Sequence, residues 1–399
     1  MYDLLIRGGR VIDPSQGLNG QLDVAVGQGV IQNIAPELPV SEATQVINVS
    51  GKIVIPGIVD IHTHTADGIT RSSANPDLVG VYSGVTTLVE AGSCGSCTFQ
   101  GMARYVVPAA KTEVICFLNI ARTGLAYLPE VREREDIDLE DTVRTIQSSN
   151  GLIRGIKLRA MGPGVRTLGF EMVRLAKEAA RRSGVRLMVH IGDWSDPKAT
   201  YRSPENTNSM TRDVLNYLDP GDIVTHLFTS YPNGILNANG KVIPEVKEAK
   251  QRGVYLDTAH GRYNFSFEAA HRVLDQGVVP DSISTDITAP GRLKPVYSMT
   301  EMMTRFLALG FTLEQVVSMT TINPAKALGL SDRLGSLAKG HQADVSVLEL
   351  HQGKWTVYDV MGSRLMATQA LTPVLTVKRG EVFSPTWGPH PWGWLPEPA

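Results

Sequence analysis

Eight short apolar runs between residues 58 and 332 constrain the fold more than any other feature of this sequence. Each run is short enough for one buried strand, and a stretch that could cover it follows. The runs are IVDIHTH (58–64), TTLVEAG (86–92), VICFLNIA (114–121), IRGIKLRA (153–160), LMVHIGD (187–193), DIVTHLF (222–228), VYLDTAHG (254–261) and DSISTDI (281–287). Helical spacing of apolar residues is clear at 169–184, 243–253 and 267–277. This alternation predicts an α/β fold, a (β/α)8 TIM barrel, because an open doubly wound sheet would leave strand edges exposed.

The two ends of the chain have strand alternation and Gly-rich turns in place of helical spacing. We therefore expect residues 1–56 and 333–382 to form one small β-sandwich domain beside a barrel of residues 57–332. The last segment, 383–399, is rich in Pro and Trp and cannot continue either pattern. We expect this tail to pack across a surface or a subunit contact, and we expect its His390 to lie at the surface.

Charge and composition exclude several classes of function. A formal net charge of -2 argues against a nucleic-acid or anionic-membrane partner. No apolar run is long enough to span a membrane, and the N-terminus has no signal-peptide core. Three cysteines cannot build a disulfide framework in a chain of 399 residues. These features predict a cytoplasmic protein with a small-molecule substrate, and we expect a homo-oligomer.

Side chains that can bind metal gather at the predicted strand ends. Functional groups of a barrel lie at the carboxyl ends of its strands, and five of the eight ends here carry such a group. They are His62, His64, Lys157, His190, His226 and Asp286. Imidazole suits zinc-like divalent ions, and a carboxylate suits both metal binding and proton transfer. A single His-x-His pair could be a solvated strand end, but the whole set predicts a metal site.

Lys157 shares a strand face with Gly155 and Arg159, and that face points into the barrel. A buried lysine is most often paired with an acid, and Glu90 or Asp193 could serve here. Burial can instead lower the pKa of the amine, and a neutral amine can add CO2 to give an anionic carbamate. Beside four histidines and Asp286, we favour the carbamate as the bridging anion of a two-metal site.

Longer motifs resemble a known family over residues 3–380. They are GKIVIPGIVDIHTH, TTINPAKALGL and GSLAKGHQADVSV, and the chain is similar to the amidohydrolase superfamily of binuclear metallohydrolases. Within it, the likeness is greatest to the amidohydrolase/deacetylase metallohydrolases, on the segments YSGVTTLVEAGSCG, FLNIARTGL, GIKLRAMG, LMVHIGD, GDIVTHLF, AHGRYNFSF and PDSISTDI. The superfamily shares the barrel and the small β-sandwich.

The resemblance implies a site with two divalent ions, which we expect to be zinc. His62, His64 and Asp286 would bind the more buried ion, His190 and His226 the second, and N6-carboxylated Lys157 would bridge them. We expect a hydroxide between the ions to be the nucleophile and Asp286 to act as general base and then general acid. The implied reaction removes acetyl from N-acetyl or O-acetyl small carboxylic acids.

Two other functions stay open at this point. Members of the superfamily that open cyclic imides or dihydroorotate have an Arg just after the His-x-His, whereas this chain reads HTHTADGITR. That difference argues against a cyclic amidase. A catalytically inactive barrel that serves as a binding or assembly protein would be expected to lose metal ligands, and this chain keeps all six.

Four further residues are candidates for substrate contact. Arg159 could bind a substrate carboxylate, or it could orient a metal ligand. His260 and Tyr263 lie in the loop after the seventh run. Cys94 belongs to CGSC (94–97), whose spacing also fits a redox dithiol or part of a zinc knuckle, but nothing else supports either. We expect Cys94 to line the mouth of the pocket.

Overall fold

The computed structural model of the chain describes residues 1–399 and contains a curled parallel sheet of seven strands, in the order β12-β11-β10-β9-β8-β7-β6. These strands are β6 (Ile58–Thr63), β7 (Val85–Ala91), β8 (Glu113–Asn119), β9 (Ile153–Arg159), β10 (Arg186–His190), β11 (Ile223–Thr225) and β12 (Tyr255–Asp257). Seven of the eight apolar runs thus become strands. The order follows the sequence, as short right-handed crossovers require.

The eighth run closes the barrel without becoming a regular strand. Asp257 bridges Ser282 on one side, and Thr63 bridges Ile287 on the other, both in parallel. The backbone nitrogen of Asp286 also donates to the carbonyl of His62 at 2.7 Å. The predicted (β/α)8 architecture is therefore confirmed, with one irregular segment where the ring closes.

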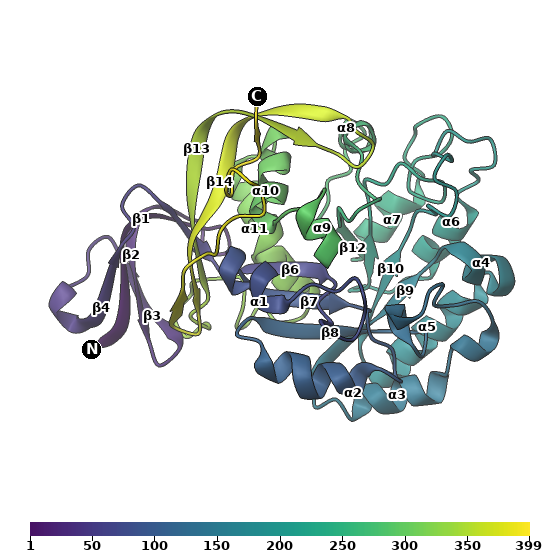
Figure 1. The fold of residues 1–399 in the computed structure, drawn as a ribbon, viewed down its shortest axis with the longest axis horizontal. Coiled ribbons are helices and arrows are strands. Elements are labelled where there is room, and N and C mark those ends of the chain that lie inside the picture. Colours follow the sequence, from purple (N-terminus) through teal and green to yellow (C-terminus); the bar gives the residue numbers. More distant parts are fainter.

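Helices surround the parallel strands (Figure 1). They are α1 (Pro76–Val79), α2 (Phe99–Gly101), α3 (Leu139–Gln147), α4 (Gly162–Leu168), α5 (Glu171–Ser183), α6 (Ser209–Tyr217), α7 (Glu245–Gln251), α8 (Phe267–Leu274), α9 (Ala289–Leu293), α10 (Met299–Ala308), α11 (Leu313–Thr320) and α12 (Ile322–Ala327). In α5 the three- and four-residue spacing of apolar side chains buries Met172, Val173 and Leu175. The three helices expected from spacing are α5, α7 and α8.

Both ends of the chain contribute to a second, mixed sheet of nine strands. Its strands are β1 (Tyr2–Asp13), β2 (Leu18–Gly27), β3 (Val30–Ala35), β4 (Ala43–Asn48), β5 (Ile53–Pro56), β13 (Val345–Tyr358), β14 (Arg364–Lys378), β15 (Glu381–Phe383) and β16 (Glu397–Pro398). Strand β5 pairs with both β1 and β13, so it joins the two ends. A cluster of 14 buried side chains, from Leu4 to Val377, forms the core of this sheet.

The hairpin of β13 and β14 extends beyond the sheet and arches over the barrel beside α10 and α8 (Figure 1). Leu348, Val357 and Leu371 of this hairpin belong to the barrel's own hydrophobic core. In its turn, Asp359 accepts a hydrogen bond from the backbone nitrogen of Phe267 at the start of α8. The two sheets are therefore joined by a continuous apolar contact.

The Pro- and Trp-rich tail packs against its own chain. His390 is buried, 5% exposed, and its Nε2 lies 2.6 Å from Glu301 Oε2, which corrects the expectation of a surface histidine. Glu301 in turn pairs with the fully buried Arg305 of α10. Strand β16 ends the tail by pairing with β13. None of the helices combines the length and the apolar character that crossing a bilayer requires.

Candidate functional site

The six predicted metal ligands converge at the carboxyl ends of the barrel strands. His62 lies in β6 and His64 directly follows it, Lys157 lies in β9, His190 ends β10, His226 follows β11, and Asp286 lies in the irregular eighth segment. A cavity of about 220 Å³ opens there, and five of the six line it: His62, His64, Lys157, His190 and Asp286. The sixth, His226, is buried beside them, with its ring centroid 4.0 Å from that of His190.

Distances between these groups are those of a ligand cluster. His64 Nε2 lies 3.0 Å from Asp286 Oδ1, and His62 Nε2 lies 3.5 Å from the same oxygen. His62, His226 and Asp286 each offer a ligand atom, and these three atoms all lie within 4.8 Å of one another. Atoms this close together can serve as ligands of one divalent cation or of two neighbouring ones.

The hydrogen bonds of Thr225 fix the tautomer of His62. The Thr225 hydroxyl donates to Asp257 Oδ2 at 2.7 Å, and its oxygen lies 3.0 Å from His62 Nδ1. A hydroxyl has only one hydrogen, so Thr225 must accept from His62 Nδ1. His62 therefore presents an unprotonated Nε2 to the cavity, the form in which imidazole binds a metal.

His226 also presents an unprotonated Nε2, and a different contact fixes its tautomer. Its Nδ1 lies 2.8 Å from the carbonyl oxygen of Ala259, which can only accept, so Nδ1 carries the hydrogen. The buried Nε2 atoms of His190 and His226 have no hydrogen-bond partner in the protein. Because such atoms are almost always paired, these two nitrogens fit a site made for a cation.

Lys157 lines the cavity but is only 1% exposed, and it has no acidic partner. Its Nζ lies 2.7 Å from His62 Nε2 and 3.6 Å from the sulfur of Met188. Neither Glu90 nor Asp193 pairs with it: Glu90 accepts from the backbone of Ser93, and Asp193 from that of Gly162. Burial lowers the pKa of Lys157 to about 7, so a large fraction of this amine is neutral at neutral pH.

Asp286 is held as an anion in a strained backbone. Burial alone would raise the pKa of Asp286, but His62 and His64 outweigh it and keep that pKa well below its usual range. Its φ of 49° lies in the left-handed region, which non-glycine residues rarely adopt. Directly behind it, a Cβ on Gly261 would meet Asp286 Oδ2 at 2.1 Å. Only glycine allows the carboxylate to sit there.

The histidines differ in charge because their surroundings differ. Burial lowers the pKa of His226 to about 4 and holds the pKa of His62 well below its usual value, with the nearby Lys157 acting in the same direction. Burial would also lower the pKa of His64, but hydrogen bonding to Asp286 outweighs it and raises that pKa. The neutral imidazoles of His62 and His226 and the carboxylate of Asp286 thus lie close together in the ligand cluster.

Two of the four candidate substrate residues lie at this cavity. Arg159 and Tyr263 both line it. Arg159 forms an ion pair with Glu130, with 3.3 Å between Arg159 Nη1 and Glu130 Oε1. Tyr263 is 38% exposed and stacks on Trp194 with 4.7 Å between ring centroids.

The other two candidates do not line this cavity, which corrects the expectation that Cys94 lies at its mouth. Cys94 is 2% exposed and belongs to the barrel core, and burial raises the pKa of its thiol. His260 is fully buried, and its ring stacks on Phe265 at 4.6 Å. Both residues lie in the loops that follow β7 and β12, and sequence spacing does not reveal that these positions are buried.

Four residues that shape the site were not among the sequence candidates. Thr225 and Asp257 hold His62, while Trp194 and Arg262 line the cavity. Trp194 and Arg262 each directly follow a predicted run, 187–193 and 254–261, so the strand-end rule could have found them. Thr225 and Asp257 are the last residues of β11 and β12, but they lie inside the predicted runs, and their contact with His62 depends on neighbouring strands.

Comparison with known proteins agrees with this geometry. Residues 53–382 match the sequence profile of the Amidohydrolase family. A protein named Deacetylase Atu3266 from Agrobacterium fabrum is 32% identical over 364 residues, covering 90% of this chain and 83% of its own length. A protein named Deacetylase from Enterococcus faecalis is 28% identical and is covered over 99% of its length, with 96% of this chain matched.

Solved structures show the same architecture. A structure described as an adenine deaminase superposes with a TM-score of 0.86 at 26% identity, covering 96% of this chain and 100% of that one. One described as a dihydroorotase superposes with a TM-score of 0.84 at 28% identity, covering 97% and 98%. The strand-end cluster, the family match and these likenesses agree. The chain belongs to the amidohydrolase family and is a hydrolase that acts on C–N bonds.

Proposed function

We propose that this protein is a binuclear metal-dependent hydrolase that removes acetyl from N-acetyl or O-acetyl small carboxylic acids. The observation that carries the proposal is the meeting of His62, His226 and Asp286, whose ligand atoms lie within 4.8 Å of one another. The relatives named deacetylase from Agrobacterium fabrum and Enterococcus faecalis support the acetyl group. The cytoplasmic location and the homo-oligomer stay predictions.

The proposed ligands divide between two ions, with zinc the ion that four imidazoles favour. His62, His64 and Asp286 would hold one ion, and His190 and His226 would hold the other. The neutral amine of Lys157 can add to the carbon of CO2 and lose a proton, which leaves a carbamate anion that would supply a further oxygen ligand to both ions. The lowered pKa of Lys157, about 7, supports this step.

In this proposal, Asp286 accepts and then donates the proton that hydrolysis requires. Divalent ions held here would polarise the scissile carbonyl and lower the pKa of water. Asp286, an anion 3.0 Å from His64 Nε2, accepts the proton of the attacking water. It then delivers that proton to the leaving amine or alkoxide.

A cyclic amidase is the second candidate, because several relatives and one solved structure are named dihydroorotase. A protein of that name from Trichlorobacter lovleyi is 26% identical over 451 residues, covering 95% of this chain and 99% of its own length. Against this reading, no arginine stands directly after His64.

A hydrolysis screen of the zinc-loaded protein separates the two. We expect release of acetate from acetylated amino or hydroxy acids, with hydantoin and dihydroorotate left intact. If the cyclic compounds were opened and the acetylated acids stayed unchanged, the protein would be a cyclic amidase and the proposal of a deacetylase would be wrong.

Metal analysis of Lys157→Ala tests the bridging role. We expect this variant to hold fewer zinc ions per chain than the parent and to lose the mass of CO2 from the peptide that contains residue 157. Lys111→Ala is the matched control, because the Lys111 side chain is 57% exposed and does not line the cavity of the ligand cluster. Equal zinc content in Lys157→Ala and the parent would remove the bridge from the proposal.

A further inference from the structure

Three polar side chains form a buried cluster that the proposed reaction does not use. Glu301 and Arg305 lie in α10, and His390 lies in the C-terminal tail, residues 383–399. Glu301 Oε1 lies 3.0 Å from Arg305 Nη2, and Glu301 Oε2 lies 2.6 Å from His390 Nε2. None of the three residues is more than 5% exposed. Because burial of such groups is costly unless each has its partners, the cluster fixes the tail on α10.

The tail is anchored on both sides of His390. Before it, the backbone nitrogen of Thr386 donates to the carbonyl oxygen of Tyr82 at 3.2 Å. After it, β16 pairs with β13. The His390 ring also stacks on the ring of Trp392, with 4.9 Å between the centroids. The position of His390 is therefore fixed by its own segment as well as by α10.

The same cluster holds the segment 294–298, which connects α9 to α10. Arg305 Nη2 donates to the carbonyl oxygen of Pro295 at 2.6 Å. The ring of Tyr297 packs on that of His390, with 4.1 Å between the centroids. Tyr297 has a φ of 68°, in the left-handed region, and a strained residue of this kind persists only where its surroundings hold it. Arg305 and His390 supply that support.

This segment in turn supports α9, which forms part of the wall of the active-site cavity. The backbone nitrogens of Val296 and Tyr297 both donate to the carbonyl oxygen of Gly291 in α9, at 3.0 and 3.2 Å. The nitrogen of Gly291 donates to the hydroxyl of Thr288 at 3.0 Å, and Thr288 lines the cavity. A chain of direct contacts thus connects the tail to the cavity wall.

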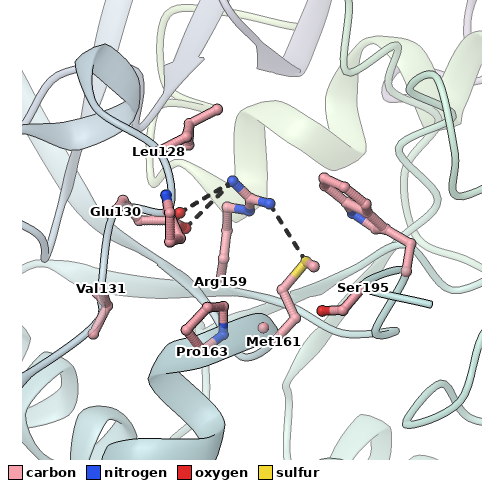
Figure 2. A pocket seen from close by; sticks show the side chains of 10 residues that line it. Leu128, Glu130, Val131, Arg159, Met161, Pro163 and Ser195 are labelled. Atoms are coloured by element: carbon pink, nitrogen blue, oxygen red, sulfur yellow. Dashed lines mark hydrogen bonds and ion pairs between the residues drawn. The ribbon is translucent and has the colours of Figure 1, made fainter. Parts of the chain in front are cut away.

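Another part of the wall is held without the tail. Arg159 lines the cavity, and its guanidinium lies 3.3 Å from the Glu130 carboxylate and 3.4 Å from the sulfur of Met161 (Figure 2). Glu130 comes from the loop between β8 and α3, and Met161 lies just after β9. An effect of the tail on the cavity should therefore be confined to the wall that α9 forms.

We propose that the C-terminal tail positions α9 at the active site, with His390 as the positioning residue. His390 does not line the cavity itself. It holds Glu301 and Tyr297, and through them the segment that supports α9. This inference goes beyond the proposed function and applies to a deacetylase and to a cyclic amidase alike, because both would use the same cavity.

Hydrogen–deuterium exchange of the full-length, zinc-loaded His390→Leu protein tests the proposal without any substrate. We expect the amides of Val296 and Tyr297 to exchange about tenfold faster than in the parent, because their hydrogen bonds to Gly291 open more often. The peptide that contains β11 should exchange as in the parent. Zinc content should also stay the same, because none of the proposed ligands is changed.

Two further variants assign the effect to the contacts of His390. His390→Gln should keep most of the protection, because the glutamine amide can still donate to the Glu301 carboxylate. His351→Leu is the matched control: His351 Nε2 lies 2.9 Å from Thr372 Oγ1 and makes no hydrogen bond to α10. Its amides at positions 296 and 297 should exchange as in the parent.

Steady-state kinetics give a second readout, on any compound that the hydrolysis screen shows to be cleaved. His390→Leu should raise KM about three- to tenfold and leave kcat within about twofold, because a displaced wall weakens binding while the ligand cluster keeps its place. A KM equal to that of the parent would overturn the connection between the segment 294–298 and the cavity.

The exchange data alone can also overturn the proposal. If Val296 and Tyr297 exchange in His390→Leu as they do in His351→Leu, the tail does not hold the segment. Exchange that rises equally throughout the barrel would show that His390 stabilises only the fold as a whole. A protein that cleaves neither class of compound would contradict the proposed function and leave the exchange test intact, so the two failures are distinguishable.

Trp392→Ala carries the test if the His390→Leu protein does not fold. The Trp392 side chain is 45% exposed, and its loss removes the ring that stacks on His390 while the contact with Glu301 remains. We expect faster exchange at the same two amides, by a smaller factor than for His390→Leu. No increase at these amides would overturn the proposal.

Discussion

At the residue scale, one hydroxyl decides which ring nitrogen His62 offers to a cation. Replacing Thr225 by Val keeps the shape of the side chain but removes the acceptor for His62 Nδ1. The ring can then turn or change tautomer, so we expect zinc affinity to fall about 10- to 100-fold, as for other groups that orient metal ligands. A competition titration with a chromogenic chelator measures it.

Thr376→Val is the control for this substitution. Thr376 is buried in β14, and its hydroxyl has no hydrogen-bond partner, so the same change there should leave zinc affinity unaltered. If Thr225→Val binds zinc as tightly as Thr376→Val does, the tautomer of His62 does not depend on this hydrogen bond.

At the scale of single residues, the sequence predicts positions well but does not predict contacts between distant residues. The strand-end rule and the period of two place all six proposed ligands at one end of the barrel, where the structure has them, because both depend only on local geometry. The partner of Arg159 could not be predicted, since Glu130 lies 29 residues away in a loop. Burial of His260 was likewise invisible, because it depends on the ring of Phe265.

At the element scale, the irregular segment 282–287 carries Asp286 and depends on the glycine that faces it. Gly261→Ala would bring a Cβ to 2.1 Å from Asp286 Oδ2, so the carboxylate must move. We expect kcat/KM to fall at least about tenfold, because misplacement of a reacting group by an ångström is costly. Circular dichroism should show a folded protein.

Gly277→Ala separates the contact from the backbone effect. Both glycines have positive φ, 58° for Gly261 and 76° for Gly277, but a Cβ on Gly277 would meet nothing within 4 Å. Both variants should lose about 1 kcal/mol of unfolding free energy, and only Gly261→Ala should lose activity. Equal activity in the two would exclude a role for this contact.

Elements with regular patterns were predicted well, and those shaped by distant contacts were not. The helix expected at 169–184 is α5 (Glu171–Ser183), since its apolar spacing records the face it buries. The run at 281–287 looks like a strand in sequence, yet the left-handed backbone of Asp286 prevents a regular ladder. Nothing in the alternation of β13 and β14 indicates that their far ends cover the barrel.

At the scale of the whole molecule, Glu113 joins the barrel to the mixed sheet. Glu113 begins β8 and accepts hydrogen bonds from Arg333 at 2.5 Å and from Lys378 of β14 at 2.8 Å. Burial alone would raise the pKa of Glu113, but Lys378 and Arg333 outweigh it and hold that pKa well below its usual range. The ionised carboxylate therefore stabilises the contact between the two sheets.

The lowered pKa of Glu113 predicts how the stability of the Glu113→Gln variant depends on pH. A carboxylate with a lowered folded pKa stabilises the protein above its unfolded pKa, near 4.5, and this contribution is lost as the pH falls toward the folded value. We expect the variant to lose about 1–3 kcal/mol at pH 7. The difference from the parent should shrink below pH 4.5 in urea unfolding.

Glu381→Gln is the control, since the Glu381 side chain is 60% exposed and its distance to Lys111 is 3.9 Å. This change should be nearly neutral at every pH, as exposed pairs usually are. A stability difference for Glu113→Gln that stays constant down to acid pH would show that charge is not its cause.

The pairing of β5 with β13 has a consequence for how the protein is made. Residues 53–56 pair with residues 345–348, so the partner of β5 leaves the ribosome only after nearly the whole chain has been synthesised. Until then β5 presents an unpaired edge, which can pair with a strand of another nascent chain. Translation that stops before residue 345 would therefore release a chain prone to aggregation, and the second sheet is completed only after synthesis is almost finished.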